Sequence, residues 1–407
     1  MVTHLENAGT IIGGKTNLDE YGMGSHSIHS QQGRVSNAHG EDLSAGGSSG
    51  GSAVAVAEGD CFAALGTDTG GSVRLPAAWN GVVGFKPSYG MVSRWGVVAY
   101  ANSLDTVGIL GRKVRDVEGV FKVIGQGSQE GGRDPTLLGQ ETLGRVKRTV
   151  EEYQKQRETR PIRFGVPNEY NTSELQQVVR DAWIKTLQKL QNAGHEIVEV
   201  SLPATKAALS AYYVLAPAEA SSNLAKFDGA RYGNRIDEPR KKGDVLYSAT
   251  RGRGLGAEVR RRILLGAYSL SAGAIDNYFI QAQKVRRLVQ RDFDDIFVMK
   301  NPLVDSRERQ SQESKVDFII APTAQSLPPK LSELDHDPID EYSTDVLTVP
   351  ASLAGLPAAS VPVPVPEEHV RHSEPVNTVG MQVIGQVGMD DQILTAARLV
   401  EEVCISP

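Results

Sequence analysis

The stretch from residue 43 to residue 72, LSAGGSSGGSAVAVAEGDCFAALGTDTGGS, holds two loops of small residues. Residues 53–58 between them predict a helix and residues 61–65 a strand. Glycines on both sides of a serine let several backbone N–H groups approach one ligand atom together, which an oxyanion hole requires. The two loops therefore indicate a site for serine-based catalysis.

A serine hydroxyl needs an activating base, and histidine is not indicated here. The sequence has no GxSxG motif. His26 and His29 lie in one polar segment and His369 and His372 in another, and we expect all four to be solvated. If the loops catalyse, the base is another residue type.

Composition excludes several classes of protein. The 407 residues carry 43 Lys and Arg against 49 Asp and Glu, and a net charge of −6 argues against this chain binding nucleic acid by itself. Two cysteines, Cys61 and Cys404, cannot make a disulfide framework, and no Cys/His cluster indicates structural zinc. No apolar run approaches the ~18 residues that span a bilayer.

Strand-like and helix-like segments alternate along the whole length, which predicts one α/β domain over 1–407 with a mostly buried sheet. Residues 126–160 and 299–315 are charged and polar, and we expect surface insertions there, the first with one exposed helix.

One motif suggests a different function. Residues 9–16, GTIIGGKT, fit the phosphate-binding pattern G-x-x-x-x-G-K-[ST]. The residues before Gly9 are polar and helix-like, and Thr10 to Ile12 favour a strand over a phosphate loop. We therefore expect a short buried strand followed by a tight turn. If the segment bound a nucleotide, ATP would protect the chain, and Lys15→Ala would abolish that protection.

A long region resembles the amidase signature family. The resemblance rests on GGSSGGSAVAVAEG, LGTDTGGSVRLPAAWNGVVGFKPSYGMVSRWGVV and ANSLDTVGIL, within about residues 44–110. Four flanking segments are similar to one branch, the A subunits of glutamyl-tRNA(Gln) amidotransferase: GKTNLDEYGMGS (14–25), AEASSNLAKFDGARYG (218–233), EVRRRILLGAYSLSAG (258–273) and DVLTVPASLAGLPAASVP (345–362). Within that branch, CFAALGTDTGGS and the polar insertions resemble an organellar member more than a bacterial one.

The resemblance implies a fold and a catalytic centre. The fold is an α/β/α sandwich whose mixed central sheet is covered by helices. Ser72 would be the nucleophile, and Ser48 the bridging serine in a cis peptide. The N–H groups of Thr69, Gly70, Gly71 and Ser72 would bind the oxyanion.

The resemblance also implies a glutamine site. Arg262 would pair with the α-carboxylate of glutamine and Asp345 with its α-ammonium, while Tyr213 would line the pocket. Two alternatives stay open: Arg262 could lie on a solvated helix face, with Arg261 as its rival, and Asp345 could cap a helix that begins at Val346.

Partners follow from the same resemblance. Ammonia from glutamine would pass to a B subunit, which would use ATP and Mg to convert Glu-tRNA(Gln) to Gln-tRNA(Gln). A small C-like or F-like subunit would complete a complex in the mitochondrial matrix. No cofactor, metal or membrane contact is expected for this chain.

One departure from the family concerns the catalytic lysine. The family carries it in an upstream I-K-D segment, further from the first serine than the 47 residues that precede Ser48 here. Lys15 belongs to a different motif. We expect the chain to be incomplete at its N-terminus; the alternatives are an inactive scaffold protein and a free-standing amidase on another carboxamide.

Overall fold

The computed structural model describes residues 1–125, 132–157, 160–236, 245–304, 315–334, 338–370 and 376–405. The strands are β1 (Ser36–Asn37), β2 (Gly40–Ser44), β3 (Ala63–Asp68), β4 (Val83–Lys86), β5 (Thr106–Gly111), β6 (Arg163–Pro167), β7 (Glu196–Val200), β8 (Phe318–Pro322), β9 (Ala358–Pro364) and β10 (Thr378–Ile384). The α-helices are α1 (Val2–Asn7), α2 (Gly50–Glu58), α3 (Arg74–Asn80), α4 (Val114–Ile124), α5 (Gln140–Arg157), α6 (Gln177–Asn192), α7 (Ala208–Asn223), α8 (Ser248–Gly254), α9 (Ala257–Ser269), α10 (Phe279–Ile296), α11 (Pro338–Ser343), α12 (Val349–Ala354) and α13 (Asp390–Ile405).

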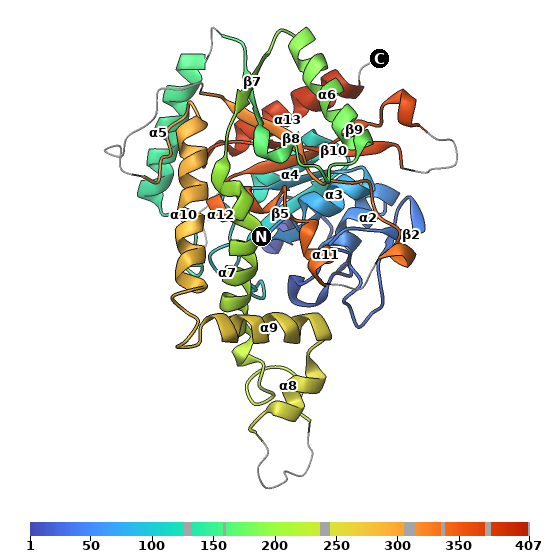
Figure 1. Ribbon diagram of the computed structural model, residues 1–407, viewed down its shortest axis with the longest axis vertical. Helices are drawn as coiled ribbons and strands as arrows, with labels where there is room; N and C mark the ends of the chain where they lie inside the picture. The colour runs from blue at the N-terminus through green and yellow to red at the C-terminus, as the bar shows by residue number, and fades with distance from the viewer. Residues whose placement is uncertain are drawn as a thin grey trace.

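The main sheet has eight strands within the described residues, in the order β3-β5-β4-β9-β10-β8-β6-β7. The pairs from β3 to β8 are antiparallel, whereas β8-β6 and β6-β7 are parallel. The sheet is therefore mixed and helices surround it (Figure 1), which confirms the predicted α/β sandwich.

Alternate residues of the strands face opposite helix layers, because side chains alternate along a strand. On β4, Phe85 packs edge-on against Phe121 of α4, with ring centroids 5.2 Å apart. Its neighbour Gly84 faces α3, where a Cβ would lie 2.5 Å from the Cβ of Ala77. Glycines on this second face, also at 66, 108 and 380, bring α2, α3 and the two serine loops close to the sheet.

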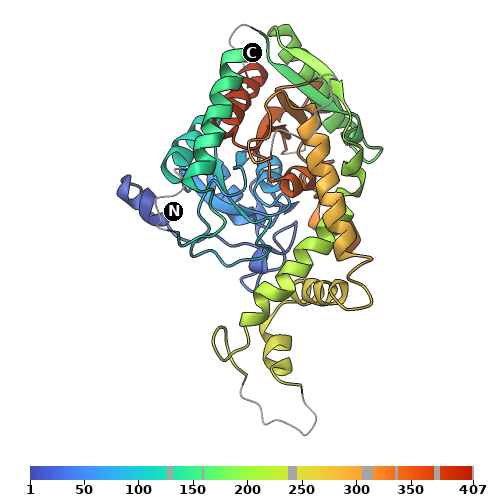
Figure 2. The same ribbon diagram turned by 90° about the vertical axis from the view of Figure 1, so that its left-hand side faces the viewer.

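The remaining helices form a flank beside the sheet. Helix α7 contacts α9, α10 and α12, and α9 lies across one end of α7 in both views (Figures 1 and 2). The segment around α8 extends from the body beyond α9. This flank supplies one wall of the site described below.

Two local predictions need revision. Thr10 to Ile12 form no strand; Ile11 is 92 % exposed and Ile12 is also exposed, because the segment leaves α1 without packing on the sheet. Helix α5, within the expected 126–160 insertion, is mostly exposed but buries Val146 and Tyr153. Residues 126–131, 158–159 and 305–314 of the two expected insertions lie outside the described residues.

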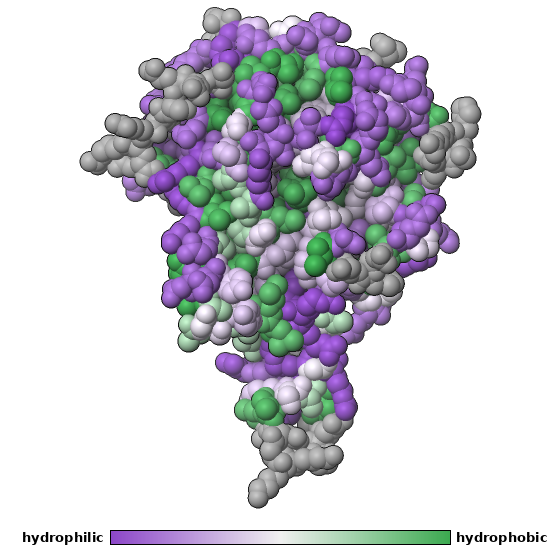
Figure 3. All heavy atoms as spheres, in the orientation of Figure 1, coloured by the Kyte–Doolittle hydropathy of each residue, from purple (hydrophilic) through white to green (hydrophobic). Residues whose placement is uncertain are grey.

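In the part of the chain that the structure describes, no helix combines the length and the apolar composition needed to cross a membrane. Hydrophilic residues cover much of the face in Figure 3, with hydrophobic ones in scattered groups between them.

Candidate active site

The two serine loops meet, as their sequence predicts. The backbone N–H of Ser49 donates to the carbonyl oxygen of Ser72 at 3.1 Å, and the Gly47–Ser48 peptide bond is cis, as the resemblance implies. Ser48 is buried and Ser72 is half-buried. The Ser48 hydroxyl has no hydrogen-bond partner within the described residues, so it is available to bond a substrate or another catalytic group.

The loop before Ser72 presents backbone N–H groups. The amides of Gly70, Gly71 and Ser72 donate no hydrogen bond to any residue that the structure describes. A Cβ on Gly70 would lie 2.7 Å from Cζ of Tyr212, and one on Gly71 would collide with the Thr348 hydroxyl. Only glycine lets this backbone pass so close to α7 and α12 and leaves its amides free for an anionic oxygen.

We expect Gly71→Ala to lower the free energy of unfolding by about 1–3 kcal/mol, because the added methyl group must displace Thr348, which is fully buried. Gly119→Ala is the matched control, since Gly119 lies in α4 with open space around it. Urea unfolding of the full chain measures both. Equal losses of unfolding free energy for the two variants would contradict the close approach of Gly71 to Thr348.

A buried ion pair lies beneath this loop. Arg74 and Asp68 are both fully buried; Nε and Nη2 of Arg74 donate to the two carboxylate oxygens at 3.0 and 2.9 Å. Burial opposes ionisation of Asp68, but Arg74 beside it holds its pKa below the usual value. Asp68 also accepts from the backbone N–H of Val73 at 3.3 Å. The pair therefore fixes both ends of the turn that carries Ser72.

A second carboxylate connects the loop before Ser72 to a neighbouring turn. Asp105 accepts from the Thr69 hydroxyl at 2.8 Å and from the backbone N–H groups of Tyr100 and Ala101 at 2.9 and 3.0 Å. Burial raises the pKa of Asp105 to about 6. The hydroxyl of Tyr100 in turn accepts from Nη1 of Arg262 at 2.9 Å, which connects the loop to α9.

Arg262 points inward from α9. It is 2 % exposed, whereas the side chain of its rival Arg261 is 45 % exposed, so the solvated-face alternative is wrong for Arg262. Nε donates to Glu258 at 2.6 Å, and Nη2 is buried without a partner in the described part of the chain. A buried unpaired guanidinium nitrogen is costly, and a ligand anion would satisfy it.

Asp345 and Tyr213 lie beside this arginine. The Tyr213 hydroxyl donates to Oδ2 of Asp345 at 3.0 Å, and the Ser25 hydroxyl donates to the same oxygen at 3.3 Å. The Tyr213 ring centroid is 5.3 Å from Cζ of Arg262. The Asp345 side chain does not cap a helix: α12 begins at Val349, and only the backbone oxygen of Asp345 accepts from Thr348. The three predicted substrate residues are thus together.

The expectation of solvated histidines is wrong for the first pair. His26 is buried and stacks on Trp79, and burial lowers its pKa to about 4. His29 is half-buried, with Nε2 3.1 Å from Glu341; burial opposes its charged form, but Glu341 raises its pKa above the usual value. Of the second pair, His369 contacts Asp181 at 2.7 Å, and His372 lies outside the described residues.

Among the residues that the structure describes, two groups of side chains lie close enough together to hold a metal ion: His29, Glu258 and Glu341, and Asp181, Glu368 and His369. In the first group, the carboxylate of Glu258 is already bonded by guanidinium groups. A cation would have to displace them, so this group is better described as an ion-pair network. The expectation that the site uses no metal stays a prediction.

The described lysines do not supply an evident base. Lys15 is exposed, whereas Ser48 is buried. Lys86 on β4 is buried, which lowers its pKa to about 7, but its Nζ donates to the carbonyl oxygen of Pro87 at 3.0 Å. Neither lysine is hydrogen-bonded to Ser48 or Ser72.

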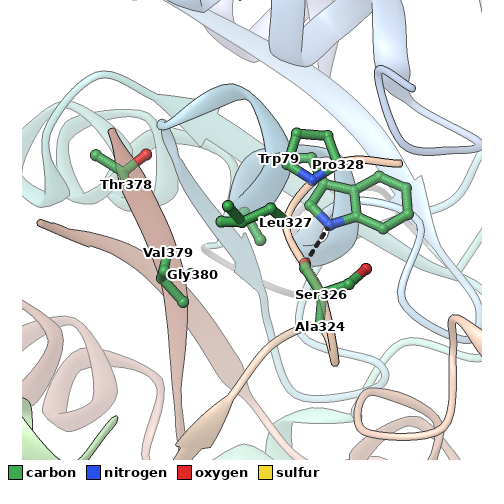
Figure 4. A pocket seen from close by; sticks show the side chains of 9 residues that line it. Trp79, Ala324, Ser326, Leu327, Pro328, Thr378, Val379 and Gly380 are labelled. Atoms are coloured by element: carbon green, nitrogen blue, oxygen red, sulfur yellow. Dashed lines mark hydrogen bonds between the residues drawn. The ribbon is translucent and has the colours of Figure 1, made fainter. Parts of the chain in front are cut away.

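A small pocket lies apart from these residues (Figure 4). Its lining comprises Ala78, Trp79, Ala324, Ser326, Leu327, Pro328, Thr378, Val379 and Gly380. The indole N–H of Trp79 donates to the Ser326 carbonyl oxygen at 3.0 Å. None of the predicted site residues lines this pocket, so we assign it no part in the chemistry.

Paired serine loops with free backbone amides, carried on a mixed sheet, are features of a serine-type amidase. Comparison with known proteins points to the same class. The amidase family model matches residues 1–394, so the chain belongs to the amidase family. Its relatives include the A subunit of the mitochondrial glutamyl-tRNA(Gln) amidotransferase of Coccidioides posadasii, 55 % identical over 100 % of this chain and 82 % of the relative. The corresponding protein of Emericella nidulans is 54 % identical over 98 % of this chain and 82 % of the relative.

A solved structure gives the same result. The crystal structure of the glutamyl-tRNA(Gln) amidotransferase A subunit from Thermotoga maritima has a TM-score of 0.74 and 34 % identity, and covers 100 % of this chain and 76 % of that one. The predicted branch of the family, the mitochondrial A subunits, is thereby confirmed as the group that this enzyme chain resembles.

Proposed function

We propose that this chain is the glutaminase subunit of a mitochondrial glutamyl-tRNA(Gln) amidotransferase. The observation that carries the proposal is the buried, unpartnered Nη2 of Arg262 beside the Asp345–Tyr213 hydrogen bond, within the described residues. A cationic and an anionic group side by side suit the α-carboxylate and α-ammonium of an amino acid. The free amides before Ser72 suit the carboxamide oxygen at the other end of glutamine.

The chemistry proceeds in two steps. The Ser72 hydroxyl attacks the carboxamide carbon and gives its proton to the Ser48 hydroxyl, which passes its own proton on to the leaving nitrogen. The amides of Thr69, Gly70, Gly71 and Ser72 hold the oxyanion. The C–N bond breaks, ammonia leaves with a proton, and a glutamyl ester remains on Ser72. Water then hydrolyses the ester to glutamate and restores the serine.

Partner subunits complete the proposed reaction. A B subunit would use ATP and Mg with the released ammonia to convert Glu-tRNA(Gln) to Gln-tRNA(Gln), and a small C-like or F-like subunit would complete the complex. The mild net charge of −6 supports this division, because the tRNA would be bound by the partner.

Ammonia release from glutamine by the complex, compared between the parent and Arg262→Ala, tests the proposal. Loss of a charge-assisted contact is expected to lower kcat/KM by about 10- to 100-fold. A free-standing amidase on another carboxamide would be indifferent to changes at Arg262 and Asp345. A scaffold protein would assemble normally and release no ammonia.

The affinity for glutamine should fall as the pH falls through about 6. Burial raises the pKa of Asp345 to about 6, so below that pH the carboxyl group is neutral and cannot pair with the α-ammonium. Well below the pKa, the Kd should rise about tenfold per pH unit. Calorimetric titration measures this, with glutaramate, which lacks the ammonium group, as the control ligand. The same pH dependence for both ligands would contradict the assignment.

A further inference from the structure

Glu258 is a buried carboxylate for which the chemistry above has no role. It lies in the first turn of α9 and is 1 % exposed. Oε1 accepts from Nε of Arg262 at 2.6 Å and from the Tyr342 hydroxyl at 2.8 Å, and Oε2 accepts from Nη1 of Arg261. A buried carboxylate persists only when its oxygens are satisfied in this way.

These contacts fix the direction of the Arg262 guanidinium. Nε is held by Glu258 and Nη1 by the Tyr100 hydroxyl, while Cζ lies 5.9, 5.3 and 5.1 Å from the ring centroids of Tyr100, Tyr213 and Tyr342. The guanidinium is planar and rigid, so holding two of its nitrogens sets the third. The third, Nη2, is the one without a partner among the described residues.

The same carboxylate also orients two stacked aromatic rings that lie beside Arg262. The Tyr342 ring, held through its hydroxyl by Glu258, stacks on Tyr213 with centroids 4.1 Å apart and planes 21° apart. Tyr213 in turn donates to Asp345. Through Oε1 alone, Glu258 thus connects Arg262 with the Tyr342–Tyr213 pair that leads to Asp345.

We propose that Glu258 is a positioning residue that makes the site selective for a carboxamide bearing an α-carboxylate. It does not touch the ligand; it aims Nη2 of Arg262 at the carboxylate and fixes the separation of Arg262 from Asp345. This role rests on the proposed function, in which glutamine is the ligand.

The test compares two ligands on the full chain carrying Ser72→Ala, which prevents turnover. Glutamine has the α-carboxylate, and 4-aminobutanamide keeps the amine and the carboxamide without it. Adding Glu258→Gln should raise the Kd of glutamine about 10- to 100-fold and leave that of 4-aminobutanamide unchanged. Arg261→Ala is the matched control, because it removes another partner of Glu258 without touching Arg262; both Kd values should stay unchanged.

Equal losses for both ligands, or no loss for either, would overturn the role of Glu258. If Glu258→Gln does not fold, Glu258→Asp replaces it: the shorter side chain cannot hold both Arg262 and Tyr342, so the same selective loss is expected. A parent chain that binds 4-aminobutanamide as tightly as glutamine would contradict the proposed function and this role with it. That result is obtained before Glu258 is changed, so failure of the proposed function can be distinguished from failure of the role of Glu258 alone.

Discussion

Ser72→Ala is expected to abolish ammonia release from glutamine, with a loss of about three orders of magnitude or more. The residual rate is small because the free amides at Gly70 and Gly71 stabilise an oxyanion only after a nucleophile has attacked. Ser48→Ala should cause a similar loss, because the two serines would act as one relay. Ammonia release by the assembled complex is the measurement.

Ser49→Ala is the control for this pair of substitutions. Ser49 follows Ser48 in the same loop, but its hydroxyl contacts the backbone of Thr67 at 3.4 Å. We expect it to retain most of the activity. If Ser49→Ala lost as much activity as Ser48→Ala, the loop as a whole, and not the Ser48 hydroxyl, would be required.

Asp68→Ala is expected to destabilise the chain by about 3–5 kcal/mol, because it leaves the guanidinium of Arg74 buried without its carboxylate. The double variant Asp68→Ala/Arg74→Met should recover part of the loss, since it removes the unpaired charge. Urea unfolding measures both.

Glu368→Ala provides the comparison for the buried pair. It breaks the Glu368–Lys185 pair, in which both side chains are about half exposed (52 % and 45 %), and should cost less than about 1 kcal/mol. If Asp68→Ala cost no more than Glu368→Ala, the ion pair would not be what holds the turn before Ser72.

The sequence predicted the arrangement of the two serine loops well, because the features that shape each loop are local. Glycines beside serines constrain the backbone within a few residues, so the close approach of the loop at 68–72 could be expected from the residues themselves. The cis peptide at Ser48 was implied by the resemblance to the amidase signature family, and the structure has it. The α/β architecture followed from the alternating segments, and the mixed character of the sheet was implied by the family resemblance. The strand expected at Thr10 to Ile12 failed because β-branched residues favour a strand only where a sheet accepts them.

The surroundings of Arg262 and Asp345 were less predictable from the sequence, since they are assembled from distant segments. Tyr100, Asp105 and Tyr342 carry no local signal for a role beside α9. Glu258 and Arg262 at i and i+4 are typical of an exposed helical ion pair. Helical spacing could nevertheless have distinguished Arg262 from Arg261, because Val259, Arg262, Gly266 and Ser269 share the buried face of α9.

Mapping the glutamyl group by mass spectrometry tests the central claim most directly. The assembled complex is mixed with glutamine, quenched in acid during turnover and digested. We predict a glutamyl ester on the peptide that contains Ser72, absent from Ser72→Ala and converted to γ-glutamyl hydroxamate when hydroxylamine is added before the quench. Ammonia release with Ser72 unmodified, or a glutamyl group on another residue, would contradict the account.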